Sequence, residues 1–141
     1  MKYNEFLKAF DPEKQDLMIL MKDFFDRSSS FKIVHEYKGA IKHATITALN
    51  TKYERYFPMN SVPFSYIVNS DSLNFYLRIN HQHLVTPEIR AAFPKNNTKA
   101  KSSKNEYSLT LNNKEEALEF LEMLFANKLG VHPNFINAFK D

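Results

Sequence analysis

Four lysines in one short segment without any acid are the residues whose types and spacing point most directly to a chemistry. The segment 95–105 (KNNTKAKSSKN) has no large apolar residue, and its basic residues are Lys95, Lys99, Lys101 and Lys104. The chain holds 19 basic and 16 acidic residues, so removing these four leaves 15 bases against 16 acids, and the net charge of +3 arises in this segment. Its composition is typical of a mobile surface loop. We predict that this loop binds a phosphate backbone; a solubilising loop with no partner is the alternative.

A second set of polar side chains falls on the stretch 73–79 (LNFYLRI), which alternates between apolar and polar residues without a break. A period of two predicts a half-buried β-strand with its apolar positions facing the core. The outward positions would then carry Asn74, Tyr76 and Arg78. If that face is uncovered, these side chains can stack on bases and hydrogen-bond to them, which would extend the predicted nucleic-acid site.

The tripeptide Glu36-Tyr37-Lys38 has the E-x-K spacing of the PD-(D/E)xK nucleases. Two residues apart on a strand, Glu36 and Lys38 point the same way and could share a metal ion and a water molecule. The pattern also needs an acid on a preceding strand, whereas the upstream acids Asp23 and Asp26 lie on or at the end of a predicted helix. A solvated strand end is the alternative interpretation.

Two histidines, His81 and His83, would share a face if strand 73–79 continued, with Glu88 nearby in the sequence. An H-x-H pair can bind zinc, and His35 and His43 could approach from the first hairpin. The sequence offers no third ligand at a diagnostic spacing. We therefore expect exposed polar histidines at a strand end, with no metal and no cofactor.

Composition excludes several common enzyme classes. Glycine occurs only at Gly39 and Gly130, so neither a P-loop nor a dinucleotide-binding fingerprint can be written. The absence of cysteine removes disulfides, thiolate nucleophiles and thiolate metal sites. No G-x-S-x-G elbow is present either. These exclusions favour a non-enzymatic function.

The chain carries no sign of a membrane or export segment. No apolar run approaches the roughly 18 residues that a membrane helix needs. The start, MKYNEFLKAF, lacks the apolar core and the cleavage site of a signal peptide. We therefore expect a cytoplasmic location and no membrane partner.

The elements that must position these residues follow from periodicity and capping signals. Asp11 and Pro12 form a helix start, and apolar residues then recur at helical spacing through residue 27. Asn113, with Glu116 three positions later, predicts a capping box at the start of the last long helix. Strands are expected at 31–37, 41–49, 63–68, 73–79 and 106–111. Thr86, followed by Pro87, predicts a capped short helix through residue 93, and another short helix is expected at 133–139. The first ten residues form a short helix or an arm.

Hairpin connections dominate this order, which favours an antiparallel sheet. A chain of 141 residues is long enough for one core. We predict a single α+β domain over 1–141, with an antiparallel sheet of about five strands and an N-terminal and a C-terminal helix packed on one face. The mobile basic loop 95–105 would project from it.

The second half of the chain reads F-x-Y-I, then LNFYLRI, then YSLTL followed by NKEEALEFLEMLF. This layout, which covers about half of the chain, resembles small domains found beside restriction and defence nucleases. The resemblance implies a link to restriction or defence systems.

Three functions follow from these observations. The first is a small non-enzymatic binding module whose favoured ligand is nucleic acid, DNA or RNA. The second is a protein that inhibits or adapts another protein, such as a phage-encoded anti-defence protein. Exposure of Tyr53, Tyr56 and Phe57 would favour that protein partner. The third is a metal-dependent nuclease at Glu36 and Lys38.

Overall fold

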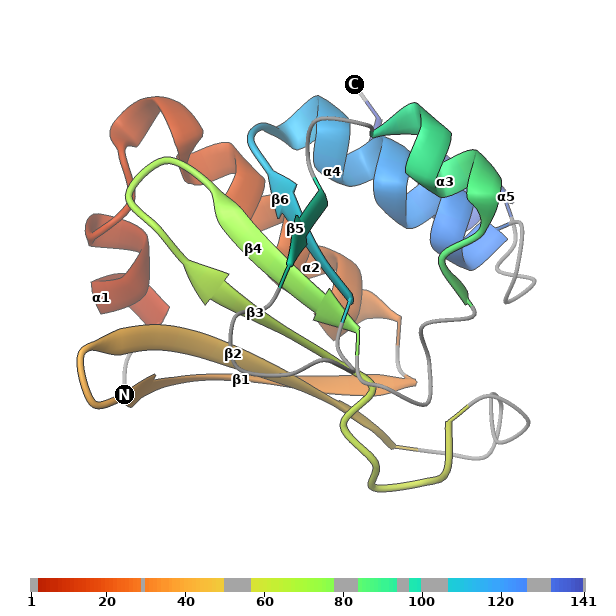
Figure 1. Ribbon diagram of the computed structural model, residues 1–141. Coiled ribbons are helices and arrows are strands. Elements are labelled where there is room, and N and C mark those ends of the chain that lie inside the picture. Colours follow the sequence, from red (N-terminus) through yellow and green to blue (C-terminus); the bar gives the residue numbers. More distant parts are fainter. Residues whose placement is uncertain are drawn as a thin grey trace.

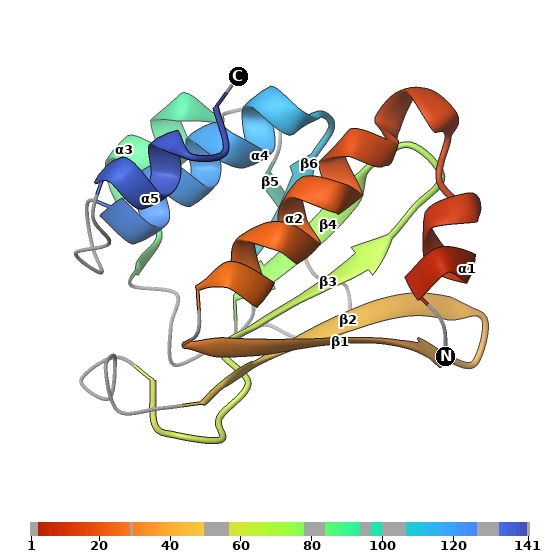
Figure 2. The same cartoon turned by 180° about the vertical axis from the view of Figure 1, so that it is seen from behind.

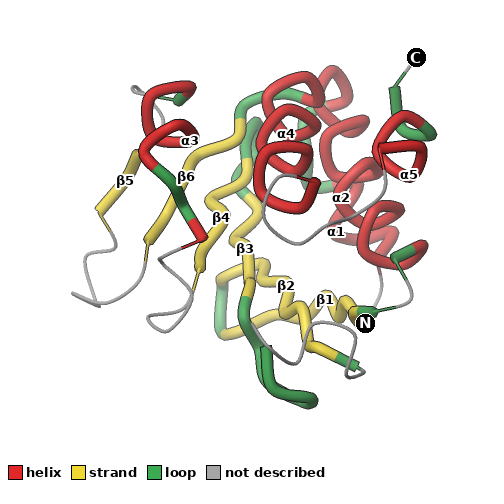
Figure 3. Tube along the Cα trace, turned by 90° about the vertical axis from the view of Figure 1, so that its right-hand side faces the viewer, coloured by secondary structure: helices red, strands yellow, loops and turns green. Residues whose placement is uncertain are grey.

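The computed structural model describes residues 3–28, 30–49, 57–77, 84–93, 97–99, 107–126 and 133–140. Within these residues the chain forms one antiparallel sheet of six strands, in the order β1-β2-β3-β4-β6-β5, with helices α1, α2 and α4 over one face (Figure 1 and Figure 3). This arrangement confirms the predicted α+β fold class. The strands are β1 (Phe31–Lys38), β2 (Ile41–Ala48), β3 (Phe64–Val68), β4 (Leu73–Leu77), β5 (Asn97–Lys99) and β6 (Tyr107–Leu111). The helices are α1 (Tyr3–Lys8), α2 (Gln15–Arg27), α3 (Pro87–Ala92), α4 (Lys114–Leu121) and α5 (Pro133–Asn137), with a 3-10 turn η1 (Pro12–Lys14) before α2 and a π-helical turn η4 (Glu122–Ala126) after α4.

The central strand β4 confirms the faces that its alternating sequence predicts. Its three apolar residues are completely buried on the helix side, and the two polar residues between them are half-buried on the other side. Positions 78 and 79, the end of the predicted strand, lie outside the described residues. The buried residues are Leu73, Phe75 and Leu77, and the half-buried ones are Asn74 and Tyr76.

Strands β1 and β2 form a regular hairpin at one edge of the sheet. They pair without a bulge from Phe31 opposite Ala48 to Lys38 opposite Ile41. The two-residue turn begins with Gly39 at φ +63, a left-handed conformation that a glycine adopts without a steric penalty. Figure 2 shows α1 close to this turn and α2 crossing the strands on the same face.

An aromatic cluster joins α2 to the sheet and to the end of the chain. Phe25 of α2 lies within 6.5 Å, ring centroid to centroid, of five other phenylalanines and is completely buried. The neighbouring Phe24 contacts Phe135 and Phe139, the second at 5.4 Å. This packing explains why the predicted helix at 133–139 forms, because α5 and the residues after it cover α2.

The structure corrects one expectation and answers part of a second question. Part of the basic segment predicted as a loop is the edge strand β5, which pairs with β6 from Asn97 opposite Leu109 to Lys99 opposite Tyr107. A three-residue polar strand has no apolar alternation, so only its pairing with β6 defines it. Phe57, whose exposure would have favoured a protein partner, is completely buried against Phe64, with ring centroids 5.2 Å apart. Residues 53 and 56 lie outside the described residues.

The helix starts follow the capping signals with one difference. Thr86 Oγ1 accepts a hydrogen bond from the Ile89 N–H at 3.2 Å, as predicted for α3. Before α2, the Asp11 side chain makes no capping hydrogen bond, contrary to the prediction. Its carbonyl oxygen instead accepts from the Lys14 N–H at 2.8 Å, because the first turn is the 3-10 turn η1.

Helix α4 begins with a modified capping box. The Glu116 N–H donates to Asn113 Oδ1 at 2.8 Å, while Glu116 Oε1 accepts from the backbone N–H of Asn112 at 3.1 Å rather than from that of Asn113. We expect Asn113→Ala to lower the free energy of unfolding by about 1 kcal/mol, because the N–H of Glu116 loses its acceptor. Urea unfolding measures the change. Asn113→Asp retains an acceptor oxygen and serves as the control; an equal loss in both variants would mean that the cap is not the cause.

Candidate nucleic-acid interface

A row of side chains crosses the outer face of the sheet, which we define as the face directed away from α1, α2 and α4. Tyr76 of β4 lies opposite Ser65 of β3 and Ser108 of β6, and Ser108 lies opposite Thr98 of β5. Ser65 and Ser108 are almost completely buried, whereas Tyr76 is half-buried. Tyr76 is thus the one large aromatic residue in this row, flanked by small hydroxyl side chains.

The next row along β4 supplies a fixed amide. Thr110 Oγ1 of β6 donates a hydrogen bond to Asn74 Oδ1 at 2.9 Å. Since the amide oxygen is the acceptor, this contact orients the Asn74 nitrogen as a donor for another partner. Side chains that can stack and donate hydrogen bonds therefore occupy neighbouring rows, as the alternation of 73–79 predicts.

One basic residue, Arg90, lies near the end of these strands, on the side of the sheet that carries the helices. Leu77, Tyr107 and Lys99 form one row across β4, β6 and β5, and Leu77 and Tyr107 of that row are buried on the helix side. The guanidinium of Arg90, an exposed residue of α3, lies 4.4 Å from the ring centroid of Tyr107. A cation at that distance from an aromatic ring is attracted to its face.

Two of the predicted binding residues, Tyr76 of β4 and Lys99 of β5, thus lie in adjacent rows of the sheet, with β6 between their strands. Lys95, Lys101, Lys104 and Arg78 lie outside the described residues. Arg90 was not predicted from the sequence. A single arginine on a short amphipathic helix gives no local signal, and the proximity of α3 to β6 is a tertiary feature.

The predicted nuclease pair keeps its shared face. Glu36 and Lys38 both lie on the outer face of β1, and the residue paired with Glu36 is His43. The upstream acids, Asp23 and Asp26, belong to α2, which covers the opposite face. Within the described residues, no group of three or more histidine, aspartate or glutamate side chains could hold a metal ion.

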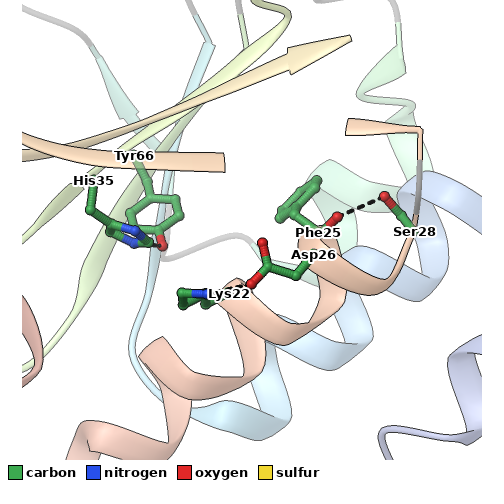
Figure 4. A network of polar contacts seen from close by, with 6 residues as sticks. All are labelled: Lys22, Phe25, Asp26, Ser28, His35 and Tyr66. Carbon is green, nitrogen blue, oxygen red and sulfur yellow. Dashed lines mark hydrogen bonds and ion pairs between the residues drawn. The ribbon is translucent and has the colours of Figure 1, made fainter. Parts of the chain in front are cut away.

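The histidines of the first hairpin do not approach each other. His35 and His43 project from opposite faces of the sheet, because His35 pairs with Ala44 and His43 with Glu36. His35 Nε2 instead lies 2.7 Å from the Tyr66 hydroxyl, on the side of the pair that faces Lys22 and Asp26 of α2 (Figure 4). His81 and His83 lie outside the described residues.

The His35–Tyr66 pair is enclosed by other side chains, and this burial shifts the pKa values of both residues. The rings of Tyr3 and Phe6 in α1 lie 5.2 and 5.5 Å from the His35 ring, and His35 is 8% exposed. Burial, followed by the positive charge of Lys22, lowers the pKa of His35 to about 4, while Asp26 opposes the shift. Burial raises the pKa of Tyr66 well above its usual value. Both side chains are therefore neutral at pH 7, so the core holds a hydrogen-bonded pair without a charge.

A surface groove of about 250 Å³ lies between α2 and the residues that follow α5. Its wall includes acids of α2 as well as basic side chains, so it offers no field of one sign to select a charged ligand. Its charged residues are Asp16, Asp23, Arg27, Lys114 and Lys140.

No protein-family model matches the chain, and neither a curated protein nor a solved structure shows significant similarity to it. The arrangement of the chain's own residues is therefore the basis for assigning a function. No helix in the described ranges is long and apolar enough to cross a membrane.

Proposed function

We propose that the protein is a non-enzymatic binding module for nucleic acid. The surface would consist of the basic residues of 95–104 and the outer face of β4, β6 and β5. The observation that supports it is the pairing of β5 with β6, which fixes part of the basic segment to the sheet edge in the rows of Tyr76 and Leu77. A basic loop elsewhere on the molecule would have no aromatic partner.

The spacing of the sheet suits a strand of nucleic acid. β4 and β5 are separated by two strand spacings, roughly 10 Å in all. A base stacked on Tyr76 would therefore have its sugar–phosphate backbone near the basic edge. Lysine charges would supply affinity that depends on salt, and the tyrosine ring would favour unpaired bases. The cytoplasmic location expected from the sequence belongs to the same proposal.

Salt-dependent titration tests the role of the lysines. Four phosphate contacts would give a log–log slope of binding constant against salt of up to about −3.6 on duplex DNA and about −2.8 on a single strand. We expect Lys→Gln replacement of Lys95, Lys99, Lys101 and Lys104 together to move the slope towards zero. Fluorescence anisotropy with labelled oligonucleotides at several salt concentrations measures it, and thermal melting checks that the variant is folded.

Two further variants separate charge from stacking. The double variant Lys101→Gln/Lys104→Gln should reduce the duplex slope by about 1.8, whereas Lys8→Gln/Lys38→Gln changes the net charge equally on the other half of the molecule and should leave it unchanged. Tyr76→Ala should weaken single-strand binding by about 1–3 kcal/mol without changing the slope. Equal slopes in the two double variants would mean that the binding site lies elsewhere on the protein. If the wild type does not bind nucleic acid at low salt, the proposed function is wrong.

The alternative function, a protein that inhibits or adapts another protein, is favoured by a different observation. Val34, Tyr37 and Ile41 in the β1–β2 hairpin are 38%, 46% and 48% exposed. Val34 and Ile41 lie on the outer face, whereas Tyr37 lies on the helix side, with its ring centroid 5.0 Å from that of Phe6. Exposed apolar side chains of this kind supply contacts at protein interfaces. A link of either function to restriction or defence stays a prediction.

A further inference from the structure

Strand β1 is at one end of the sheet order. The pairing with β2 shows which of its N–H and C=O groups bond to β2 and which point to the free edge. The Leu49 N–H donates to the Ser30 carbonyl oxygen at 2.9 Å, which makes 30 and 49 a hydrogen-bonded pair. Hydrogen-bonded pairs alternate along an antiparallel ladder, so positions 32, 34, 36 and 38 bond to β2. Ile33, His35 and Tyr37 therefore direct their N–H and C=O groups towards the edge, away from β2.

This edge lacks most of the features that prevent strands from pairing. It is eight residues long, has no proline and no bulge, and carries charges of both signs. Lys32, Glu36 and Lys38 are on the outer face, with Val34 between them. A strand with alternating charges can be complementary to a second copy of itself when the two run antiparallel.

The backbone directions restrict how two copies can pair. Positions whose N–H and C=O groups point towards the free edge must oppose each other across the interface. The two-fold axis therefore passes between two copies of the same residue. With the axis at Val34, Lys32 of each copy lies opposite Glu36 of the other, and the two Val34 side chains meet. With the axis at His35, Lys32 would oppose Lys38, and with the axis at Ile33 neither Lys32 nor Glu36 would meet an opposite charge. With the axis at Tyr37, Glu36 would oppose Lys38, but only positions 36–38 of the two strands would pair. The register about Val34 is thus the one that combines complementary charges with pairing along most of the strand.

We propose that two copies of this chain associate through β1, antiparallel about a two-fold axis at Val34, to form one continuous sheet. Ile33 and His35 of the two copies would exchange backbone hydrogen bonds on both sides of the axis. Val34 and Lys32–Glu36 would occupy the non-hydrogen-bonded pairs, in which side chains are closest. The exposure of Val34 and Tyr37, at 38% and 46%, agrees with an edge that is covered on association.

A charge-exchange experiment tests this register. Sedimentation velocity of the wild type from about 1 to 200 μM, without nucleic acid, should show a concentration-dependent shift from monomer to dimer. Glu36→Lys and Lys32→Glu should each raise the dimer Kd by about tenfold or more, because both cross-strand pairs then carry like charges. Both positions are on the strand surface, and thermal melting checks that each variant is folded.

Mixing the two single variants provides the decisive measurement. Glu36→Lys has lysine at both positions 32 and 36, and Lys32→Glu has glutamate at both, so an equimolar mixture should form a heterodimer although neither variant alone forms a dimer at the same concentration. The double variant Lys32→Glu/Glu36→Lys should regain the wild-type Kd. A monomeric wild type at 200 μM, or single variants with an unchanged Kd, would overturn the proposal. The quadruple lysine variant of 95–104 should dimerise normally, which separates this result from nucleic-acid binding.

Discussion

Replacement of Phe25 by alanine is expected to lower the free energy of unfolding by about 3–5 kcal/mol. Phe25 is completely buried at the centre of the aromatic cluster, between α2, the sheet and the turn η4. Removal of its ring would leave a cavity lined by other phenylalanine rings, which are too large to collapse into it without changing rotamer. The loss of stability therefore has two parts: the lost hydrophobic free energy of burying the ring, and the cost of the cavity that remains.

Guanidinium unfolding followed by far-UV circular dichroism measures this loss. Ile19→Ala is the control on the same helix, because Ile19 is 43% exposed and its truncation should change stability by about 0.5 kcal/mol or less. Similar losses in the two variants, or a loss below about 1 kcal/mol for Phe25→Ala, would mean that the helix presents another face to the sheet.

Acidification should destabilise the protein through His35. The pKa of His35 is about 4 in the folded state, against 6.5 for the ordinary side chain. Between these values the unfolded chain binds more protons than the folded one, so stability is full above pH 6.5 and falls as the pH decreases towards 4. The whole shift corresponds to at most about 3 kcal/mol, lost across that interval, with no further loss from this group below pH 4.

Carboxyl groups titrate in part of the same pH interval. The contribution of His35 is therefore the difference between the wild type and a variant that lacks this histidine. Urea unfolding of the wild type and of His35→Gln at pH 7.0 and 4.5 should show a smaller loss in the variant. Tyr66→Phe removes the hydroxyl from the pair and should cost about 1–3 kcal/mol at pH 7, because His35 loses a buried partner. The pH dependence should persist in that variant, since burial is its main cause. Identical pH dependence in wild type and His35→Gln would contradict this account.

Local patterns predicted most of the elements because the residues that define them are close in sequence. The alternation of 73–77 decided the faces of β4, since one apolar face is buried and a shift of one residue would expose it. Asn113 and Thr86 marked helix starts because a capping oxygen acts within three residues. These features require no knowledge of the rest of the fold.

Features that depend on distant segments were not predictable in the same way. β5 exists because β6 offers it a pairing edge, and the polar residues Asn97 to Lys99 carry no pattern of their own. Phe57 is buried because Phe31 and Phe64 surround it. For the candidate site, the sequence indicated Tyr76 and the basic segment, but not that pairing of β5 with β6 places Lys99 in the row next to that of Tyr76. Nor did it indicate the contact of Arg90 with Tyr107 on the helix side of the sheet.

The contact of Phe24 with Phe135 and Phe139 has a consequence for biosynthesis. The ribosome releases α2 and the first four strands well before the residues that cover Phe24. The interval from position 77 to position 139 corresponds to roughly 3–12 s at typical rates of translation. During that time the apolar side of α2 and the free edge of β4 are open to solvent, so we expect the nascent chain to be a substrate for ribosome-associated chaperones until α4 and α5 emerge.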